Sequence, residues 1–247
     1  MAFAGDHKSI SDIIKNLPRE KDEEGRDFAV IGDMMIPLPG DEPPGGMHTY
    51  VFKPGVKLWP NGTVPYAFHA NVSPPRQAMA RHAMNQWESG SPFRFVPRNG
   101  QATYLLIRDS DRNRSTVGRV QGVNNLQLRD WDLRTICHEL AHVFGLWHEH
   151  QRPDRDHFVE ILWDNINPQY QHDWEIIANG IVKGPYDFTS VTHYEPDRGA
   201  LPQRIAIRCR PPWQNQQGVI GQAQVPSYED KRELEQYYRD KGAFLIS

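Results

Sequence analysis

The chain contains few cysteines, no long apolar run and little net charge. Only 2 of its 247 residues are cysteine, so at most one disulfide can form, which permits a reducing compartment without requiring one. No apolar run is long enough to cross a membrane, and we expect no membrane partner. The formal net charge of −3 gives no indication of a nucleic-acid partner. The function must therefore be inferred from particular motifs.

The N-terminus also lacks the apolar core of a secretory signal peptide, because residues 1–8 read MAFAGDHK. Three interpretations of the compartment stay open. The protein is cytoplasmic, it leaves the cell by another route, or a signal peptide has already been removed. The sequence does not decide the localisation.

The segment HELAHVFGLWH, residues 138–148, follows the pattern H-E-x-x-H-x-x-G-x-x-H. Two histidines four residues apart lie on one face of a helix, so His138 and His142 can reach one metal ion. Gly145 can end the helix in a left-handed conformation, after which the chain turns back and presents His148 as a third ligand. Three imidazoles leave one coordination position open, which is typical of catalytic zinc rather than structural zinc. Glu139 lies beside the ligands, where it can hold and deprotonate a water molecule.

The short pattern H-E-x-x-H also occurs on ordinary surface helices, where the histidines are solvated. The additional Gly145 and His148 argue against that alternative. So does an apolar stripe around the metal-facing positions, with Asp130 or Asp132 available as N-cap. The stripe consists of Leu133, Ile136, Leu140, Val143 and Phe144.

Other elements can be predicted around this helix. A helix should begin at Ser73-Pro74 and run to about Trp87. Short apolar runs predict strands at residues 93–95, 104–107 and 126–128. The region after the metal-binding segment is rich in Pro, Gly, Asn and Trp, and we expect it to be irregular. A terminal helix with a start resembling a capping box is predicted for residues 227–239.

The residues after the third histidine resemble a known family. The run HEHQRPDRD at residues 148–156 and the run YDFTSVTHY at residues 186–194 resemble two segments of the astacin-like metalloproteases of the metzincin clan. The second of these is the family's Met-turn, usually S-x-M-H-Y. Similar segments lie on both sides, and the resemblance covers about residues 50–240. They are LWPNGTVPY at 58–66, FRFVPR at 93–98, STVGR at 115–119, WDNI at 163–166, IGQ at 220–222, and a final helix with Ser227, Asp230 and Tyr237.

The resemblance implies an α+β fold with a metzincin-like catalytic domain. Its N-terminal half would be a twisted, mostly parallel sheet with two helices, its C-terminal half would be irregular, and a cleft would separate them. The implied activity is that of a zinc metalloendopeptidase with one zinc ion per chain and a protein or peptide substrate. Zinc would polarise the scissile carbonyl and lower the pKa of its water, while Glu139 passes a proton to the leaving amine. An extended peptide would add to a sheet edge near residues 115–118.

Tyr194 has a role only by resemblance. In the family, this tyrosine contacts zinc in the resting enzyme as a fifth ligand and then swings away to hydrogen-bond the transition state. The alternative is an ordinary buried tyrosine. His193 should point away from the metal if Tyr194 points toward it. The remaining histidines have no expected role in the site. His150, His157 and His172 follow it but lack its spacing, and four others are expected to be surface or partly buried residues: His7, His48, His69 and His82.

The sequence departs from the family at three points. Thr192 replaces the Met-turn methionine, which predicts a site of lower zinc affinity or lower rigidity that still functions. The family's disulfide positions hold other residues, and Cys137 stands where the family has a buried apolar residue, so a buried free thiol is expected rather than a bridge to Cys209. Ala223 stands where the family often has an arginine that favours an acidic residue after the cut, so that preference is in question.

Residues 1–48 form an N-terminal extension before the catalytic domain at residues 49–247. Within it, residues 9–17 predict a short amphipathic helix, residues 28–35 are apolar, and residues 37–46 have the composition of a linker. Gly32-Asp33 resembles the F-x-G-D stretch of astacin propeptides, whose aspartate occupies the zinc, although Val30 replaces the phenylalanine. The alternative is a simple turn.

If the first interpretation holds, the full chain is a zymogen. By the same resemblance, Glu149 would pair with the new N-terminal ammonium after cleavage within residues 45–50. Two rival functions remain. One is a zinc-dependent peptide-binding protein that has lost turnover, against which the intact Glu139 and Tyr194 argue. The other is a structural zinc site, against which the absence of a fourth ligand in register argues. Oligomeric state and physiological substrate are not predicted.

Overall fold

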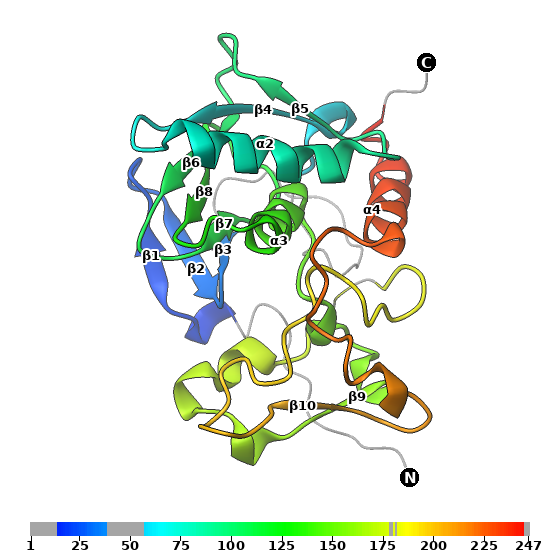
Figure 1. Cartoon of the computed structure of the whole chain (residues 1–247). Coiled ribbons are helices and arrows are strands. Elements are labelled where there is room, and N and C mark those ends of the chain that lie inside the picture. The colour runs from blue at the N-terminus through cyan, green and yellow to red at the C-terminus, as the bar shows by residue number, and fades with distance from the viewer. Residues whose placement is uncertain (1–13, 39–56, 178–179, 181, 245–247) are drawn as a thin grey trace.

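The structure is a computed structural model that describes residues 14–38, 57–177, 180 and 182–244. Eight strands form its main sheet. They are β1 (Arg19–Lys21), β2 (Asp27–Ile31), β3 (Met34–Pro37), β4 (Thr63–Phe68), β5 (Arg94–Pro97), β6 (Tyr104–Asp109), β7 (Arg114–Thr116) and β8 (Val123–Leu128). Their order across the sheet is β1-β2-β3-β7-β8-β6-β4-β5 (Figure 1). The three predicted strands correspond to β5, β6 and β8.

The part of the sheet that belongs to the catalytic domain is mostly parallel, as predicted. Strand β4 pairs in parallel with β5 and β6, and β6 pairs in parallel with β8. Only β7 runs antiparallel to its neighbour β8. Parallel strands need crossover connections, and here the long connection from β4 to β5 contains a helix.

Three α-helices that lie entirely within the described residues accompany the sheet. They are α2 (Pro74–Glu88), α3 (Leu133–Phe144) and α4 (Tyr228–Asp240). Helices α2 and α3 lie side by side on one face of the sheet (Figure 1). Helix α2 begins as predicted, with Pro74 in its first turn, although the Ser73 side chain makes no capping hydrogen bond. Helix α4 begins with the predicted capping box between Ser227 and Asp230. The buried core between sheet and helices includes Trp87, Phe93 and Phe144.

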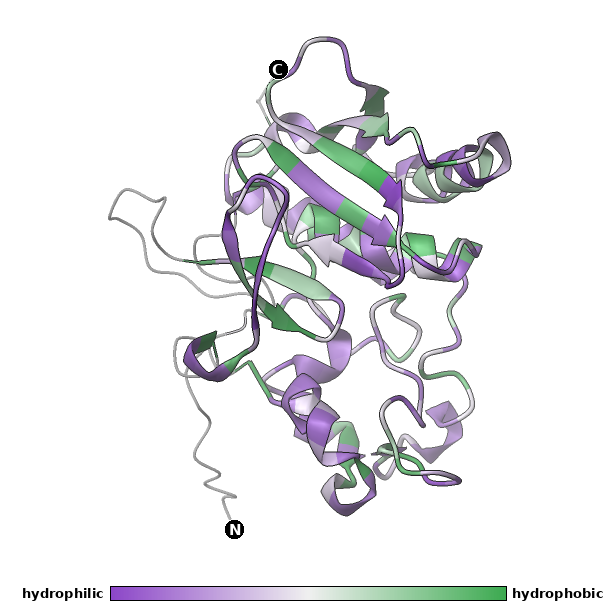
Figure 2. Ribbon diagram, turned by 90° about the vertical axis from the view of Figure 1, so that its left-hand side faces the viewer, coloured by the Kyte–Doolittle hydropathy of each residue, from purple (hydrophilic) through white to green (hydrophobic). Residues whose placement is uncertain are grey.

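The region after α3 is irregular, as predicted from its proline and glycine content. Between α3 and α4, the described residues form two short antiparallel strands, β9 (Val159–Ile161) and β10 (Ile207–Cys209), and are otherwise turns, loops and short 3-10 helices. These lie at Glu149–Gln151, Arg155–His157, Trp163–Asn165, Pro168–Trp174 and Gln214–Gln216, and a further one, Pro60–Gly62, precedes β4. A separate apolar cluster around Trp174 forms the core of this half. Figure 2 shows hydrophobic and hydrophilic segments next to each other along the strands, whereas the short helices of the lower half are mostly hydrophilic.

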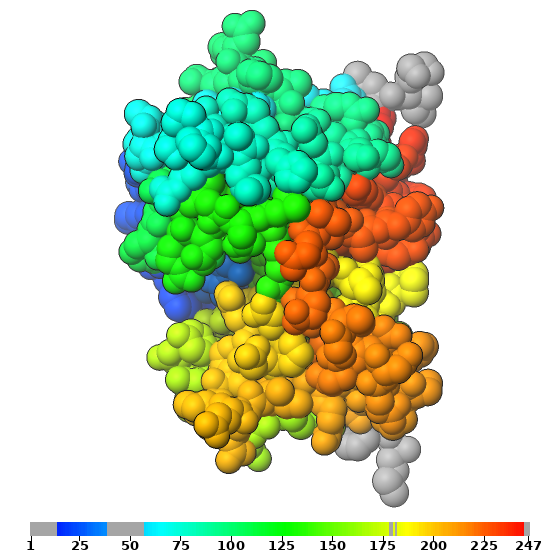
Figure 3. All heavy atoms as spheres, viewed as in Figure 1, coloured from blue at the N-terminus to red at the C-terminus, as the bar shows by residue number. Residues whose placement is uncertain are grey.

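The N-terminal extension contributes three strands of the main sheet. Strand β3 pairs in parallel with β7, where Ser115 N–H donates to Asp33 O at 2.9 Å and Val117 N–H donates to Met35 O at 3.0 Å. The edge that we expected to receive a peptide is therefore covered by the chain's own β3. In the space-filling view, the extension, in blue, reaches the indented boundary between the two halves (Figure 3).

A second apolar cluster joins the extension to the rest of the molecule. It combines Ile14, Leu17, Ala29, Ile31, Met34 and Ile36 of the extension with Val117, Trp147 and Ile177. Residues 14–16 are helical, in agreement with the end of the helix predicted at residues 9–17. The rest of that helix, most of the linker at 37–46 and the cleavage stretch at 45–50 lie outside the described residues.

Both cysteines are free and buried, as expected. Burial raises the pKa of the Cys137 thiol to about 12, so this group remains protonated near neutral pH. Across the described ranges, no helix is both long and apolar enough to span a membrane.

Candidate metal centre and active site

Helix α3 begins and ends as its sequence dictates. Of the two aspartates proposed as N-cap, Asp132 takes this position, and its carboxylate accepts the Thr135 N–H at 2.9 Å. Gly145 ends the helix with φ of 104°, in the left-handed region. The apolar stripe is buried except for Leu133, which is partly exposed. The helix is therefore fixed in position and rotation against the core.

The structure brings the three motif histidines together through their Nε2 atoms. His138 Nε2 lies 3.1 Å from His142 Nε2 and 3.3 Å from His148 Nε2. On the opposite side of the rings, His138 Nδ1 lies 2.9 Å from Val191 O and His142 Nδ1 lies 2.7 Å from Leu146 O. A carbonyl oxygen can only accept, so both Nδ1 atoms carry the proton and both Nε2 lone pairs face the common point.

Burial keeps the imidazoles of His142 and His148 neutral. It lowers the pKa of His142 to about 4, and it also lowers the pKa of His148. His148 Nδ1 lies 3.1 Å from Gln151 Oε1, which orients the ring in the same way. Neutral imidazole is the form that binds zinc.

Asp33 of the extension completes the cluster. Its Oδ1 lies 2.9 Å from His148 Nε2 and 3.5 Å from His142 Nε2, and its Oδ2 lies 3.4 Å from His138 Nε2. One ligand atom from each of these four residues lies within 4.8 Å of the others. Three imidazole nitrogens and a carboxylate are a donor set that zinc accepts, so the residues present fit the metal.

The turn that carries Asp33 requires glycine at position 32. Gly32 has φ of +57°, and a Cβ at this position would lie 2.5 Å from the Tyr194 hydroxyl. Its N–H donates to Asp173 Oδ1 at 2.7 Å. The two interpretations of Gly32-Asp33 are thus compatible, because the segment is a turn and also directs Asp33 toward the histidines.

Glu139 is 1% exposed, and its Oε2 has no hydrogen-bond partner among the described residues. Burial, together with the negative charge of Asp33, raises the pKa of Glu139 well above its usual value. A carboxyl group with a raised pKa can exchange protons near neutral pH. This atom is therefore available for a water molecule or a substrate.

Tyr194 is also buried beside the histidines. Its ring centroid lies 4.4 Å from that of His148 and 4.1 Å from that of His150, and its hydroxyl has no partner within the described chain. His150 is fully buried and contacts Asp173 O through Nε2 at 3.1 Å. Sequence reasoning missed this packing role, because His150 lies outside the motif spacing.

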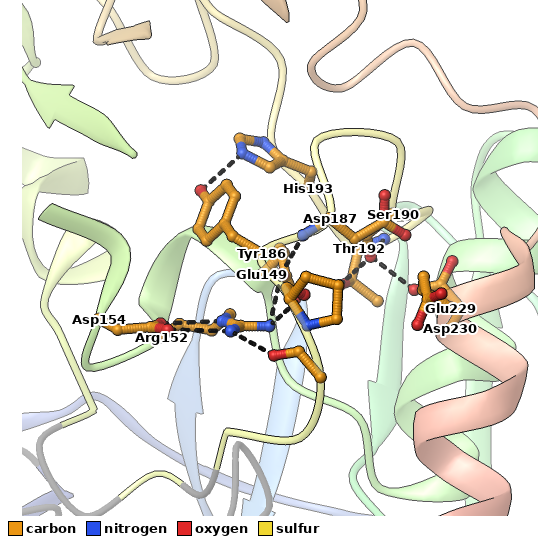
Figure 4. A network of polar contacts seen from close by, with 12 residues as sticks. Glu149, Arg152, Asp154, Tyr186, Asp187, Ser190, Thr192, His193, Glu229 and Asp230 are labelled. Carbon is orange, nitrogen blue, oxygen red and sulfur yellow. Dashed lines mark hydrogen bonds and ion pairs between the residues drawn. The ribbon is translucent and has the colours of Figure 1, made fainter. Parts of the chain in front are cut away.

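The turn beneath the histidines is held by hydroxyl groups instead of a methionine. Thr192 is 2% exposed, and its Oγ1 lies 2.9 Å from Ser190 Oγ, which donates to Asp230 Oδ1 at 2.6 Å. Val191 N–H donates to Asp230 Oδ2 at 2.9 Å, and Val191 O is the acceptor for His138. Figure 4 shows Asp230 on α4 next to this turn. The buried hydroxyl of Thr192 is therefore satisfied, and the turn is tied to α4.

His193 contacts Tyr186 and the backbone of Tyr194 and is not part of the metal-binding cluster, as expected (Figure 4). Its Nδ1 donates to Tyr194 O at 2.9 Å, so its Nε2 accepts from the Tyr186 hydroxyl at 2.8 Å. Burial lowers the pKa of His193 to about 4. A neutral His193 thus fixes the backbone that carries Tyr194.

Glu149, the candidate partner of a new N-terminus, already has partners in this chain. Its Oε1 accepts from Arg152 Nη1 at 3.0 Å and from Asp187 N–H at 2.8 Å (Figure 4). Arg152 also pairs with Asp154. An incoming ammonium group would join a filled network and not an isolated carboxylate.

Comparison with known proteins agrees with this geometry. The family model of astacin, a peptidase family, matches residues 52–239. The chain belongs to the astacin family. Members of this family are zinc metalloendopeptidases, and their cofactor is one zinc ion per chain.

Two relatives and one solved structure illustrate the similarity. The chain is 39% identical over 145 residues to zinc metalloproteinase nas-7 of Caenorhabditis elegans, a match that covers 56% of this chain and 38% of that protein. It is 31% identical over 193 residues to human tolloid-like protein 1, covering 74% of this chain and 19% of the relative. The hatching enzyme zinc-protease high choriolytic enzyme 1 from the medaka fish Oryzias latipes matches with a TM-score of 0.68 at 28% identity, covering 74% and 94% of the two chains. The chain thus spans less than half of the two curated relatives, and its predicted astacin-like fold is confirmed.

Proposed function

We propose that this chain is a zinc-dependent endopeptidase in its latent form. The observation that carries the proposal is the convergence of three histidine Nε2 atoms in the same site as the buried carboxyl oxygen of Glu139, which has no hydrogen-bond partner among the described residues. A purely structural site would not need a buried base next to its ligands. The substrate would be a protein or a peptide, as for the family.

His138, His142 and His148 would hold the zinc ion. When bound, zinc supplies Lewis-acid chemistry that polarises the scissile carbonyl and makes a water molecule more acidic. The Nδ1 contacts with Val191 O, Leu146 O and Gln151 keep the three rings oriented. Thr192 would support this arrangement through its hydroxyl, where the family uses a methionine.

Glu139 would act as the general base and then as the general acid. Its raised pKa allows it to take a proton from the attacking water and to return it to the leaving amine. Tyr194 would donate its hydroxyl hydrogen to the developing oxyanion once the extension has left. The hydroxyl, which faces Gly32 in the full chain, would be freed at that stage and could also approach the metal as a fifth ligand.

Residues 1–48 would act as the inhibitory segment. Asp33 would be the latency ligand, since its carboxylate occupies the point shared by the histidines. Strand β3 also covers the β7 edge, so the substrate path is blocked twice. Removal of the extension would expose both the metal centre and the edge, and Glu149 would then receive the new N-terminus.

Glu139→Gln tests the proposal. The variant should bind one zinc per chain like the parent but lose about a hundred- to ten-thousandfold of its casein-cleaving activity after removal of the extension, because only the base has been removed. A chelator should abolish the cleavage by the parent. Equal cleavage by parent and variant would disprove the role of Glu139. Zinc binding with no cleavage by the trimmed parent would favour the rival function of a peptide-binding protein.

A further inference from the structure

Arg198 lies at the metal centre without a role in the proposed function. Its Nη2 is 3.6 Å from Asp33 Oδ2, the same oxygen that lies 3.4 Å from His138 Nε2. Among the described residues, Asp33 is the only carboxylate with which Arg198 forms an ion pair. An anionic oxygen at this position thus faces the histidines on one side and a guanidinium on the other.

The position of Arg198 is fixed by its neighbours. Its guanidinium carbon lies 5.2 Å from the ring centroid of Tyr194, and its backbone N–H donates to Glu195 O in a tight turn. Glu195 in turn forms an ion pair with Arg134 of α3. On the other side, Leu201 N–H donates to Asn165 O at 2.7 Å. The turn is therefore held at both ends, and the side chain lies along the tyrosine.

Peptide hydrolysis develops negative charge on the carbonyl oxygen of the scissile bond. The water oxygen bonds to the carbonyl carbon, the π electron pair moves to the carbonyl oxygen, and a water proton passes to Glu139. The carbonyl then re-forms, the C–N bond breaks, and the amine nitrogen takes the proton from Glu139. Donors that face the developing oxyanion contribute more to rate than donors that bind the neutral carbonyl.

We propose that Arg198 is a catalytic residue that stabilises this oxyanion beside Tyr194, and that the same guanidinium holds Asp33 in the latent chain. The inference rests on the proposed function. A guanidinium stays charged at all relevant pH values and donates in a fixed plane. Its side chain is 52% exposed, so solvent and salt weaken its contribution.

The test compares Arg198→Gln, Arg198→Met and Arg198→Lys with the parent, all loaded with zinc. The enzymes are folded as full chains, cut at a protease site inserted after Gly46 and separated from the extension. Methionine keeps an apolar stem over the Tyr194 ring, and lysine keeps the charge. The matched control is Arg208→Gln, because Arg208 is similarly exposed, at 57%, and pairs with Glu160 across the β9–β10 pair, away from α3 (Figure 1).

Two readouts are measured. The first is kcat and KM on two peptides that differ only in having alanine or glutamate after the cut. The second is the affinity of a phosphinic peptide, which mimics the tetrahedral anion, measured by calorimetry. The Gln and Met variants should lose about tenfold in kcat on both peptides, with little change in KM. Their affinity for the phosphinic peptide should fall by about the same factor, and the Lys variant should lie between them and the parent.

Three outcomes would overturn the inference. One is an unchanged kcat and unchanged phosphinic affinity in both the Gln and Met variants. Another is an effect limited to a higher KM for the glutamate peptide, which would show that Arg198 binds the substrate side chain after the cut and not the oxyanion. The last is an equal loss in Arg208→Gln. If the trimmed parent itself cleaves neither peptide, the proposed function has failed, which is distinct from any of these results.

Discussion

The two halves of this molecule hold their structure in different ways. The half before Gly145 is a sheet covered by α2 and α3, with an aromatic core that includes Trp87 and Phe144. The half after it contains α4 and the short β9–β10 pair, but its described residues are otherwise turns and 3-10 helices. These combine an apolar cluster around Trp174 with buried polar contacts such as those of Asp230 (Figure 4). The regular half supplies the first two histidines and Glu139 on one helix. The irregular half supplies Tyr194, Thr192 and Arg198, which surround them.

This comparison shows how the site divides its tasks. A helix fixed by apolar packing sets the spacing of the ligands. The surrounding residues lie in segments that have neither helical nor sheet backbone hydrogen bonds. There, hydrogen bonds between side chains and the backbone hold the chain in position. The extension contacts both halves, through β7 and through Asp173, so its removal should affect both at once.

Removing Asp230 should show the dependence of the irregular half on polar contacts. Asp230→Ala deletes acceptors for Ser190, Val191 and Ser227, and buried donors left without partners are costly. We expect the free energy of unfolding to fall by about 3 kcal/mol, measured by urea denaturation. Glu235→Ala on the same helix is the control, because its ion pair with Arg239 is exposed and should contribute less than about 0.5 kcal/mol. Similar losses in both variants would contradict the comparison.

Acidification should weaken the same half through His193. Its pKa is lowered to about 4 in the folded protein and is about 6.5 when unfolded. The unfolded state therefore binds the proton first, so the stability conferred by the neutral histidine is complete above pH 6.5 and decreases between pH 6.5 and 4. For His193 alone, we expect a loss of about 2 kcal/mol between pH 7 and pH 5.

The measurement is the pH dependence of unfolding with chelator present, so that metal binding does not contribute. His193→Gln should show a shallower decrease than the parent. His82→Gln, a change at an exposed histidine of α2, should leave the slope as it is. A parent and a His193 variant with the same slope would show that this histidine does not titrate as its burial implies.

Thr192→Val should have the smallest effect. It removes one buried hydroxyl while keeping the side-chain shape, so the free energy of unfolding should fall by about 1 kcal/mol. Thr192→Ser serves as the control because it retains the hydroxyl that contacts Ser190. It removes one methyl group and so leaves a small cavity. If the valine variant matches the parent in both stability and zinc retention, the hydroxyl contact is dispensable.

The sequence predicted the regular half well for physical reasons. Apolar periodicity specified α2 and α3, Gly145 marked the end of α3, and the capping residues marked the start of α4. The family resemblance suggested Tyr194 and Asp33, and the structure brings both to the histidines. Their roles remain predictions. The β2–β3 strands of the extension were missed because residues 28–35 show no alternation that distinguishes a strand from a buried loop.

The positions of His150, Asp173 and Arg198 could not be predicted from the sequence. Each lies in an irregular segment, where the direction of a side chain depends on contacts with residues far away in the chain. Arg198, for example, follows Tyr194 by four residues, but it reaches the centre only because its turn is held to Arg134 and Asn165. No local pattern encodes such contacts.

The most direct test of the account is the peptidase activity of the uncut chain beside that of the trimmed chain. Both are loaded with one zinc ion and assayed on the same peptide, together with uncut Asp33→Ala. The account predicts weak activity in the uncut parent, a partial increase in uncut Asp33→Ala because β3 still covers the edge, and full activity after trimming. Equal activity of the uncut and trimmed parent would contradict it, because Asp33 and β3 would then not block the site.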